Sequence, residues 1–441
     1  MEKLELKGHR LSVLCLDHSS SVGSTRSRSS SKQSSNAAPV TGPSFLLSGS
    51  EDGTARLWDL RSRHAALCIV APAEVGSSTP PEVTSVAFHP IDLGGGSIES
   101  QGEYARRATV YLGVESNVYG YDLRYATGPI VRGRCDHDLS GVLESEDEIN
   151  RLAFSPAGLE HRVHVAAADD AGDVRVTDMA PARRQQRVKI DHRRRCRVLQ
   201  HGDGGSAMAT CAAFRPRSTG LDLASGGTDC AVSLWDVSRP KRPLSTVKIT
   251  TDNVGAGQVC NPPMVFDVTW SPSGRLLVAG LGDGTASVLS VRGRNLYETF
   301  RIRGGHSSSI ASVIFPRFGC DSSSHVAAND RLLISAGSDC NLMLWDLGSE
   351  VAGKHAVDPS TWLEGCSSPK SNNDHATVEG KMADLGLKEL TVDSPRKLFG
   401  IPHEKKMNHL TSSGSNDILL PSTLFVADTT KDITAYILAR Q

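Results

Sequence analysis

The sequence predicts an all-β fold, a single seven-bladed β-propeller. The 441 residues include 41 glycines, with 39% hydrophobic and only 5% aromatic residues, which suits many short strands joined by tight turns. One motif also recurs along the chain, as it does in folds built from repeated blades. Each copy contains a small-residue strand, a turn, a second strand and an aromatic-Asp pair. We therefore treat residues 1–441 as one closed ring.

Three copies of the motif are nearly complete. They read SGSEDGTARLWD over 48–59, SGGTDCAVSLWD over 225–236 and SAGSDCNLMLWD over 335–346. In each copy an Asp follows the first Ser by four residues and a Trp follows that Asp by six, so the Asp falls in a turn and the Trp in the next strand. A preceding His can complete a buried polar chain that runs from Asp to His, Ser and the indole N–H.

This signature resembles the WD-repeat family, which implies a propeller that binds other proteins. The residues expected to form polar chains are His9, Ser48, Asp52 and Trp58 in blade one; His201, Ser225, Asp229 and Trp235 in blade four; and His306, Ser335, Asp339 and Trp345 in blade six. Ser, His and Asp can also make a catalytic triad, but a nucleophile would not recur in several blades beside a Trp. We therefore expect these residues to be structural and the protein not to be an enzyme.

Four weaker copies bring the count of blades to seven. The Trp position is taken by Tyr121 in blade two, Thr177 in blade three and Leu289 in blade five. At the turn, blade two has Glu115 and blade five keeps Asp283. Blade seven is the most degenerate copy and ends in Thr423–Leu438.

The two ends of the sequence predict how the ring closes. Residues 4–6 lie where a fourth strand belongs, whereas the chain ends after a third strand, so the N-terminal strand should complete blade seven and remove a free sheet edge. Seven blades of ~40–45 residues leave about a hundred residues or more outside the sheets. We assign these to a Ser-rich disordered insertion at 18–43 in blade one and a flexible insertion at 348–397 between blades six and seven.

Charge and cysteine usage argue against several classes of protein. Lys and Arg number 48 and Asp and Glu 49, so the formal net charge of −1 gives no overall attraction to nucleic acid or anionic membrane. The ten cysteines are scattered without zinc-site spacing, and we expect reduced thiols, no metal and no cofactor. The N-terminus lacks an apolar signal region, and no stretch reaches the ~20 apolar residues that cross a bilayer. A monomeric protein of the cytoplasm, the nucleus or both is expected.

Two neighbouring blades carry an aromatic-Asp-x-Arg box. The boxes are Trp58-Asp59-Leu60-Arg61 and Tyr121-Asp122-Leu123-Arg124. They resemble the box of propellers that dock on damage-specific DNA-binding protein 1, the adaptor of cullin-4 ubiquitin ligases, which implies a receptor for an unidentified substrate protein. An Arg just past such a strand can fork onto carboxylates or carbonyls of a partner. The alternative is that both arginines are solvated, in a general scaffold or a chromatin-associated reader.

Several segments further resemble the family of WD repeat-containing protein 53. They include VTSVAFHP from Val83, EINRLAFSP from Glu148, NPPMVFDV from Asn261 and LFVADTTKDITAYIL from Leu424. This resemblance also implies a cullin-4 substrate receptor. The Ser-rich insertion departs from that family's pattern.

A basic run and two Ser-Pro sites are further candidates for function. The run ARRQQRVKIDHRRRCR over 182–197 is interpreted as a nuclear-import signal, a nucleic-acid contact or a solvated loop beside a strand, and its lack of aromatic residues weakens stacking on bases. Ser368 and Ser394 each precede a Pro and are candidates for phosphorylation, which would add about −2 charge beside lysines.

Two other patterns are not interpreted as cofactor-binding or metal sites. GLGDGT from Gly280 has glycines at nearly dinucleotide-like spacing but lies in a predicted turn between strands, outside any strand-to-helix context. His403, Glu404 and His409 are close in sequence but lack the metal-ligand spacing of a helix, so we interpret them as loop residues.

Overall fold

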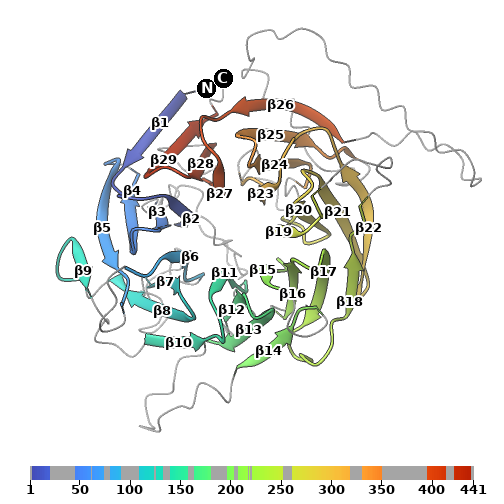
Figure 1. Cartoon of the computed structure of the whole chain (residues 1–441), viewed down its shortest axis with the longest axis horizontal. Coiled ribbons are helices and arrows are strands. Elements are labelled where there is room, and N and C mark those ends of the chain that lie inside the picture. The colour runs from blue at the N-terminus through green and yellow to red at the C-terminus, as the bar shows by residue number, and fades with distance from the viewer. Residues whose placement is uncertain are drawn as a thin grey trace, which may run out of the picture.

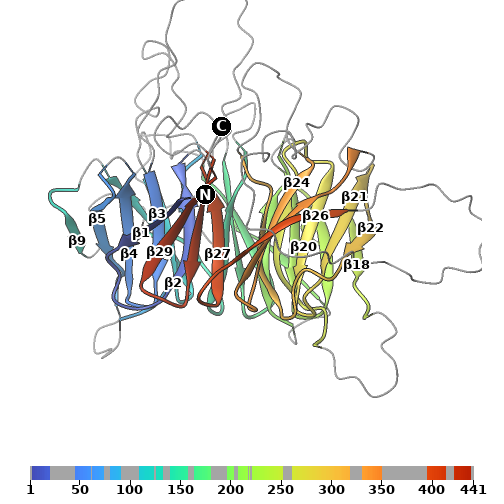
Figure 2. The ribbon, with the colours of Figure 1, turned by 90° about the horizontal axis from the view of Figure 1, so that it is seen from above.

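The computed structural model is a closed ring of seven blades around a central axis (Figure 1), as predicted. From the side the ring is flat, and its strands run across its thickness (Figure 2). The structure describes residues 2–19, 45–60, 62–73, 80–90, 109–123, 126–132, 140–156, 163–179, 196–202, 207–216, 218, 221–251, 261–317, 330–349, 395–413 and 422–438.

The first four blades are antiparallel meanders that run from the axis outward in chain order (Figure 1). Blade one contains β2 (Val13–His18), β3 (Phe45–Ser50), β4 (Thr54–Asp59) and β5 (His64–Val70). Blade two contains β6 (Val83–Phe88), β7 (Thr109–Val114), β8 (Asn117–Asp122) and β10 (Ser140–Glu144). Blade three contains β11 (Ile149–Phe154), β12 (His164–Asp169), β13 (Asp173–Asp178) and β14 (Arg197–Gln200). Blade four contains β15 (Ala209–Phe214), β16 (Asp222–Gly227), β17 (Ala231–Asp236) and β18 (Ser245–Lys248).

The remaining blades follow the same plan. Blade five contains β19 (Val265–Trp270), β20 (Leu276–Leu281), β21 (Ala286–Arg292) and β22 (Asn295–Ile302). Blade six contains β23 (Ile310–Ile314), β24 (Leu332–Gly337), β25 (Asn341–Asp346) and β26 (Arg396–Pro402). Blade seven contains β27 (Met407–Ser412), β28 (Thr423–Asp428), β29 (Asp432–Ile437) and, as its outer strand, β1 (Glu2–Lys7).

The N-terminal strand closes the ring, as the sequence predicts. β1 pairs antiparallel with β29 over its whole length, from Glu2 opposite Ile437 to Lys7 opposite Asp432. The first and the last described strands of the chain therefore lie side by side (Figure 1). Leu6 is 1% exposed and packs in a cluster shared by blades seven and one. This pairing leaves no unpaired edge on β29.

The hydrophobic core is divided among the contacts between blades. Within the described residues, each pair of adjacent blades shares one cluster of buried side chains, so seven clusters follow one another around the ring. Single blades have no core of their own, because a four-stranded sheet must bury both faces against neighbours. Stability therefore depends on complete closure.

Every innermost strand begins with the same β-bulge. In all seven blades the pairing register to the second strand shifts between the first and third residues of the innermost strand. A bulge leaves one extra residue outside the regular ladder and sharpens the twist of the strand. The repeated bulge turns polar side chains at this level toward the next blade, as described below.

Blade one has a fifth strand that the sequence did not predict. β9 (Ile130–Arg132) comes from the connection between β8 and β10 of blade two and pairs in parallel with β5, with Ile130 opposite Cys68. The Cys68 N–H also donates to the Pro129 carbonyl at 2.8 Å. The outer edge of blade one is therefore covered by a segment of blade two (Figure 1).

The predicted insertions lie mostly outside the described residues, and their predicted limits need correction. β2 extends to His18, and Ser19 is also described, so residues 20–43 of the first insertion are the part not described. The second insertion ends too late in the prediction, because β26 begins at Arg396 and includes Lys397. These two residues pair with Asp346 and Trp345 of β25, which a flexible loop would not do.

Ring closure by β1 makes Leu6 a test of the fold. We expect Leu6→Ala to lower the free energy of unfolding by about 2–5 kcal/mol, because it opens a cavity in the cluster between blades seven and one. Thermal unfolding and urea titration measure the loss. Glu2→Ala, at an exposed position of the same strand, should change stability by no more than about 0.5 kcal/mol. Equal effects of the two substitutions would contradict this closure.

Candidate functional site

A buried polar chain links four side chains in blade one. His9 lies just before the innermost strand, Ser48 in β3 and Trp58 in β4, whereas Asp52 is in the turn between those two strands. His9 Nε2 is 2.7 Å from Ser48 Oγ, and Trp58 Nε1–H donates to the same oxygen at 2.9 Å. His9 Nδ1 lies 3.2 Å from Asp52 Oδ2. The chain satisfies the indole, the hydroxyl and the imidazole inside the blade.

Blade six repeats this arrangement. His306 Nε2 is 2.8 Å from Ser335 Oγ, His306 Nδ1 is 3.0 Å from Asp339 Oδ1, and Trp345 Nε1–H donates to Ser335 Oγ at 2.9 Å. The Asp339 carboxylate also accepts the Ser307 N–H at 2.9 Å. The same local spacing therefore produces the same hydrogen bonds in two distant blades.

Blade four makes the same chain with the imidazole turned over. His201 uses Nδ1 toward Ser225 Oγ at 2.8 Å and Nε2 toward Asp229 Oδ1 at 3.1 Å, and Trp235 Nε1–H donates to Ser225 Oγ at 2.8 Å. His201 precedes its innermost strand by more residues than His9 or His306 does, and it comes directly after β14. The imidazole of His201 thus contacts a Ser and an Asp as His9 and His306 do, although its backbone comes from a different direction.

The electrostatics favour a neutral His in blades one and six and an ionised Asp in all three blades. Burial lowers the pKa of His9 and His306, although their Asp partners oppose this effect. Burial by itself would raise the pKa of the turn Asp residues, but hydrogen bonds from the His and from nearby N–H and O–H groups outweigh it and lower the pKa of Asp52, Asp229 and Asp339. The hydroxyls of Ser48, Ser225 and Ser335 belong to fully buried residues, so a substrate cannot reach them.

Blade seven contains a polar chain that the sequence analysis missed. His403 is buried, with Nδ1 2.7 Å from Tyr436 Oη and Nε2 2.7 Å from Asp428 Oδ2. Tyr436 occupies the Trp position of β29, and burial raises its pKa to about 12. His403 lies in the connection between β26 and β27, as the loop interpretation has it, but its part in this buried chain was not predicted. Its sequence signal is its place four residues before an innermost strand, which His9 and His306 share.

A second set of polar residues lies at the bulge of each innermost strand. The third residue of these strands is, from blade one to blade seven, Cys15, Ser85, Arg151, Cys211, Asp267, Ser312 and His409. Several of them accept a hydrogen bond from the fourth amide of the next innermost strand. The acceptors are Ser85 Oγ from Leu152 at 2.9 Å, Asp267 Oδ2 from Val313 at 2.9 Å, Ser312 Oγ from Leu410 at 3.3 Å and His409 Nδ1 from Leu16 at 3.3 Å.

Arg151 departs from this pattern, because a guanidinium cannot accept a hydrogen bond. Its Nη2 instead reaches Asp267 Oδ1 at 3.1 Å, and its Nη1 lies against His409 Nε2. One side chain thus connects blades three, five and seven. Burial and the charge of Arg151 hold the pKa of His409 well below its usual value. His409 lies in β27, so its interpretation as a loop residue is wrong.

The two predicted boxes lie at the ends of equivalent strands in adjacent blades. Trp58 and Asp59 end β4, and Tyr121 and Asp122 end β8. The polypeptide therefore leaves both blades at the same rim of the ring. Leu60 is 3% exposed, and Leu123 packs against the cluster between blades one and two. Arg61 and Arg124 lie outside the described residues.

The repeats match a known family. The "WD domain, G-beta repeat" family matches residues 2–59 and 258–289, which fall in blades seven, one and five of the ring. The protein is a seven-bladed β-propeller that contains WD repeats. This fold is a scaffold for protein interactions.

Three curated proteins are similar to parts of the WD-repeat propeller. Nuclear distribution protein PAC1 of Arthroderma otae is 25% identical over 208 residues, which are 46% of this chain and 41% of that protein. WD repeat-containing protein VIP3 of Arabidopsis thaliana is 32% identical over 104 residues, 23% of this chain and 31% of that protein. Denticleless protein homolog of Mus musculus is 35% identical over 82 residues, 19% of this chain and 10% of that protein. The matched segments thus span less than half of each relative.

The other predicted sites of the WD-repeat propeller are mostly outside the described residues. Of the basic run 182–197, only Cys196 and Arg197 are described, and Arg197 begins β14. Ser368 and Ser394 are not among the described residues. Within the described ranges, no group of three or more His, Cys, Asp or Glu side chains is placed to hold a metal ion, and no helix is long and apolar enough to cross a membrane. Burial raises the pKa of the Cys15 and Cys211 thiols to about 12.

Loss of the central hydroxyl should show how much the polar chain contributes. We expect Ser335→Ala to lower the free energy of unfolding by about 1–3 kcal/mol, because Trp345 Nε1–H and His306 lose their shared partner inside the blade. Urea unfolding followed by tryptophan fluorescence measures the change. Ser307→Ala, beside the same His but at an exposed position, should stay within about 0.5 kcal/mol of wild type.

The buried His residues predict the pH dependence of stability. Because the folded pKa of His9 and His306 is lowered, the unfolded chain binds more protons, so stability falls as the pH drops below about 6.5. The turn Asp residues, also with lowered pKa, add a further loss below about pH 4. Urea midpoints at several pH values should therefore fall on acidification. A His9→Gln/His306→Gln variant should be less stable at pH 7 but have a shallower slope between about pH 6.5 and 5; an unchanged slope would contradict the assignment.

Proposed function

We propose that this propeller is a non-catalytic substrate receptor that docks on damage-specific DNA-binding protein 1, the adaptor of cullin-4 ubiquitin ligases. The observation that carries the proposal is the pair of aromatic-Asp-x-Arg boxes at the same rim of two adjacent blades. Kinship with WD repeat-containing protein 53, suggested by several segments of the sequence, supports the same role. The substrate is an unidentified protein that another part of the ring holds. We place the protein in the cytoplasm, the nucleus or both.

The residues around each box suit a rigid docking point. Trp58 is fully buried and its indole is held by Ser48, while the Leu60 side chain packs between blades seven and one. The chain after Leu60 turns back at once, because the Ser62 and Arg63 N–H groups donate to the Asp59 carbonyl at 3.1 and 3.0 Å. A short anchored turn loses little conformational entropy when a partner binds it.

The second box is tied to the first blade by β9. After Leu123 the chain continues to Ile130–Arg132, which pairs with β5 immediately downstream of the first box. Leu123, Ala126 and Val131 all pack against the cluster that blades one and two share. The two boxes therefore belong to one packed unit, which favours a single partner that contacts both of them.

The bonding capacity of arginine explains why both boxes end in this residue. Its planar guanidinium offers five donors and can fork onto a carboxylate or onto two carbonyls of a partner. Arginine is also among the residues that contribute most to binding when an interface desolvates it. An arginine that stays solvated would contribute little to the binding free energy. A binding measurement on arginine variants can therefore distinguish the two cases.

The two arginines provide the direct test. We expect the Arg61→Ala/Arg124→Ala variant to bind the purified adaptor about thirtyfold more weakly or worse, corresponding to about 2 kcal/mol lost at a desolvated interface. Biolayer interferometry with immobilised adaptor and co-precipitation from cells measure the effect.

A matched control lies on the opposite rim. Arg10→Ala/Lys431→Ala removes two exposed cations near the contact between the Val13 N–H and the Thr430 carbonyl, and should leave adaptor binding unchanged. If wild type and the Arg61→Ala/Arg124→Ala variant bind the adaptor equally, or if wild type does not bind, the ligase role is wrong. The protein would then be a general scaffold or a chromatin-associated reader.

A further inference from the structure

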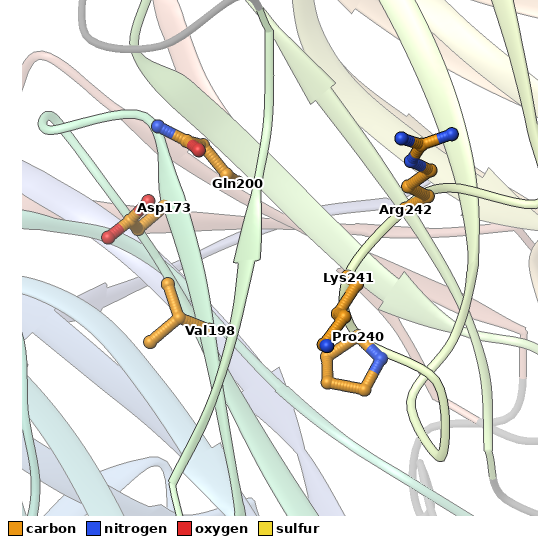
Figure 3. Close-up of a pocket in the computed structure, with 6 residues that line it drawn as sticks. All are labelled: Asp173, Val198, Gln200, Pro240, Lys241 and Arg242. Carbon is orange, nitrogen blue, oxygen red and sulfur yellow. The ribbon is translucent and has the colours of Figure 1, made fainter.

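A groove lies on the perimeter of the ring, between blades three and four. Asp173, Val198 and Gln200 line one side of it, from β13 and the outermost strand β14 (Figure 3). Pro240, Lys241 and Arg242 line the other side, from the connection between β17 and β18 (Figure 3). Its volume of about 570 Å³ is in the range of ligand sites in proteins. The boxes of the proposed adaptor site lie in blades one and two, so this groove is separate from them.

The blade-three side of the groove is the edge of a sheet. β14 is the last strand of its sheet, and its other edge pairs with β13 from Val176 opposite Arg197 to Asp173 opposite Gln200. Side chains alternate along it: Leu199 is fully buried in the cluster that blades three and four share, whereas Val198 and Gln200 are exposed on the other face of the strand. Val198 is 42% exposed, one of few large apolar side chains with so much surface in the described residues. An edge strand of this kind can accept a further strand.

The blade-four side of the groove carries positive charge without a partner. Lys241 and Arg242 are exposed, and neither forms an ion pair or hydrogen bond with a residue in the described part of the chain. The one carboxylate of the groove, Asp173, lies 3.4 Å from Arg175 Nη2. Burial and the neighbouring Asp169 raise the pKa of Asp173. The groove is therefore cationic on one side and has a hydrogen-bonding edge with an apolar side chain on the other.

We propose that this groove binds an extended acidic segment of a partner protein as an additional strand on β14. The segment's backbone pairs with the outer edge of β14, an apolar side chain covers Val198, and carboxylates on the alternate face meet Lys241 and Arg242. This alternation follows from the two-residue period of a strand. Nucleic acid fits the groove less well, because none of the six lining residues is aromatic and the Asp173 carboxylate would face a phosphate backbone.

Charge reversal at Lys241 and Arg242 in the full-length protein tests the role of the blade-four side of the groove. The probe is a fluorescein-labelled synthetic peptide of about ten residues that alternates glutamate with valine, followed by fluorescence anisotropy. We expect saturable binding that weakens as salt is raised, and a loss of affinity of about tenfold or more in the Lys241→Glu/Arg242→Glu variant. Lys405→Glu/Lys406→Glu reverses two other exposed cations and is the matched control, with an expected change of less than about twofold.

Hydrogen exchange on the same complex tests the added strand. Backbone amides of residues 197–200 should exchange more slowly when the peptide is bound, because an added strand protects the outer edge of β14. The proposal is overturned if wild type does not bind the peptide, if a lysine-valine peptide binds equally well, or if protection appears only elsewhere. Displacement of the peptide by oligothymidylate with a higher affinity than the peptide itself would assign the groove to nucleic acid instead. Adaptor binding through the boxes is measured separately, so either result leaves the proposed ligase role independently testable.

Discussion

Hydrogen bonds between the third residue of one innermost strand and the fourth amide of the next link neighbouring blades at the centre of the ring. Each bulge displaces one residue from the ladder, and the side chain beside it reaches across to the neighbouring blade. The same step recurs around the ring, for example from Ser85 to Leu152 and from Ser312 to Leu410. One such contact, from His409 to Leu16, joins blade seven to blade one, so this inner layer and the outer pairing of β1 on β29 strengthen the same junction of the ring.

Arg151 shows how the layer tolerates a residue that cannot make this bond. A buried cation is costly unless it is paired. Arg151 pairs with the Asp267 carboxylate from blade five and lies against His409 from blade seven, so its charge is balanced by a group that only the closed ring brings near it. The innermost strands are thus connected across the ring as well as between neighbouring blades.

Features that depend on local spacing or on the order of strands in the repeat could be predicted from the sequence, whereas side-chain contacts between distant blades could not. The Ser and Trp of a polar chain are separated by ten residues, and a single hairpin brings them together in blades one, four and six. Arg151 and His409 are separated by 258 residues, and nothing in their local sequence indicates that they meet. β9 was missed for a related reason: three residues form a strand only because β5 offers them an edge.

His403 lies between these two cases. Its distance from the innermost strand matches that of His9 and His306, so the position could be recognised, but the Ser and Trp that usually identify the chain are absent. Tyr436 replaces both of them by bringing its own hydroxyl to His403 Nδ1. The polar chain is recognised in a sequence by the spacing of its Ser and Trp. It could not be recognised here, because the Tyr436 side chain takes the place of both residues.

The use of Ser, His and Asp inside the blades determines where function can lie. These groups satisfy one another away from solvent, so recognition must use the rims and the perimeter, where side chains project from a rigid frame. A rigid frame matters for a protein that would bring two partners together. Blades one and two and blades three and four hold fixed positions in one closed ring, so partners bound at the boxes and at the β14 groove would meet at a constant separation. Such a geometry raises the effective concentration of one partner near the other even when each contact is weak.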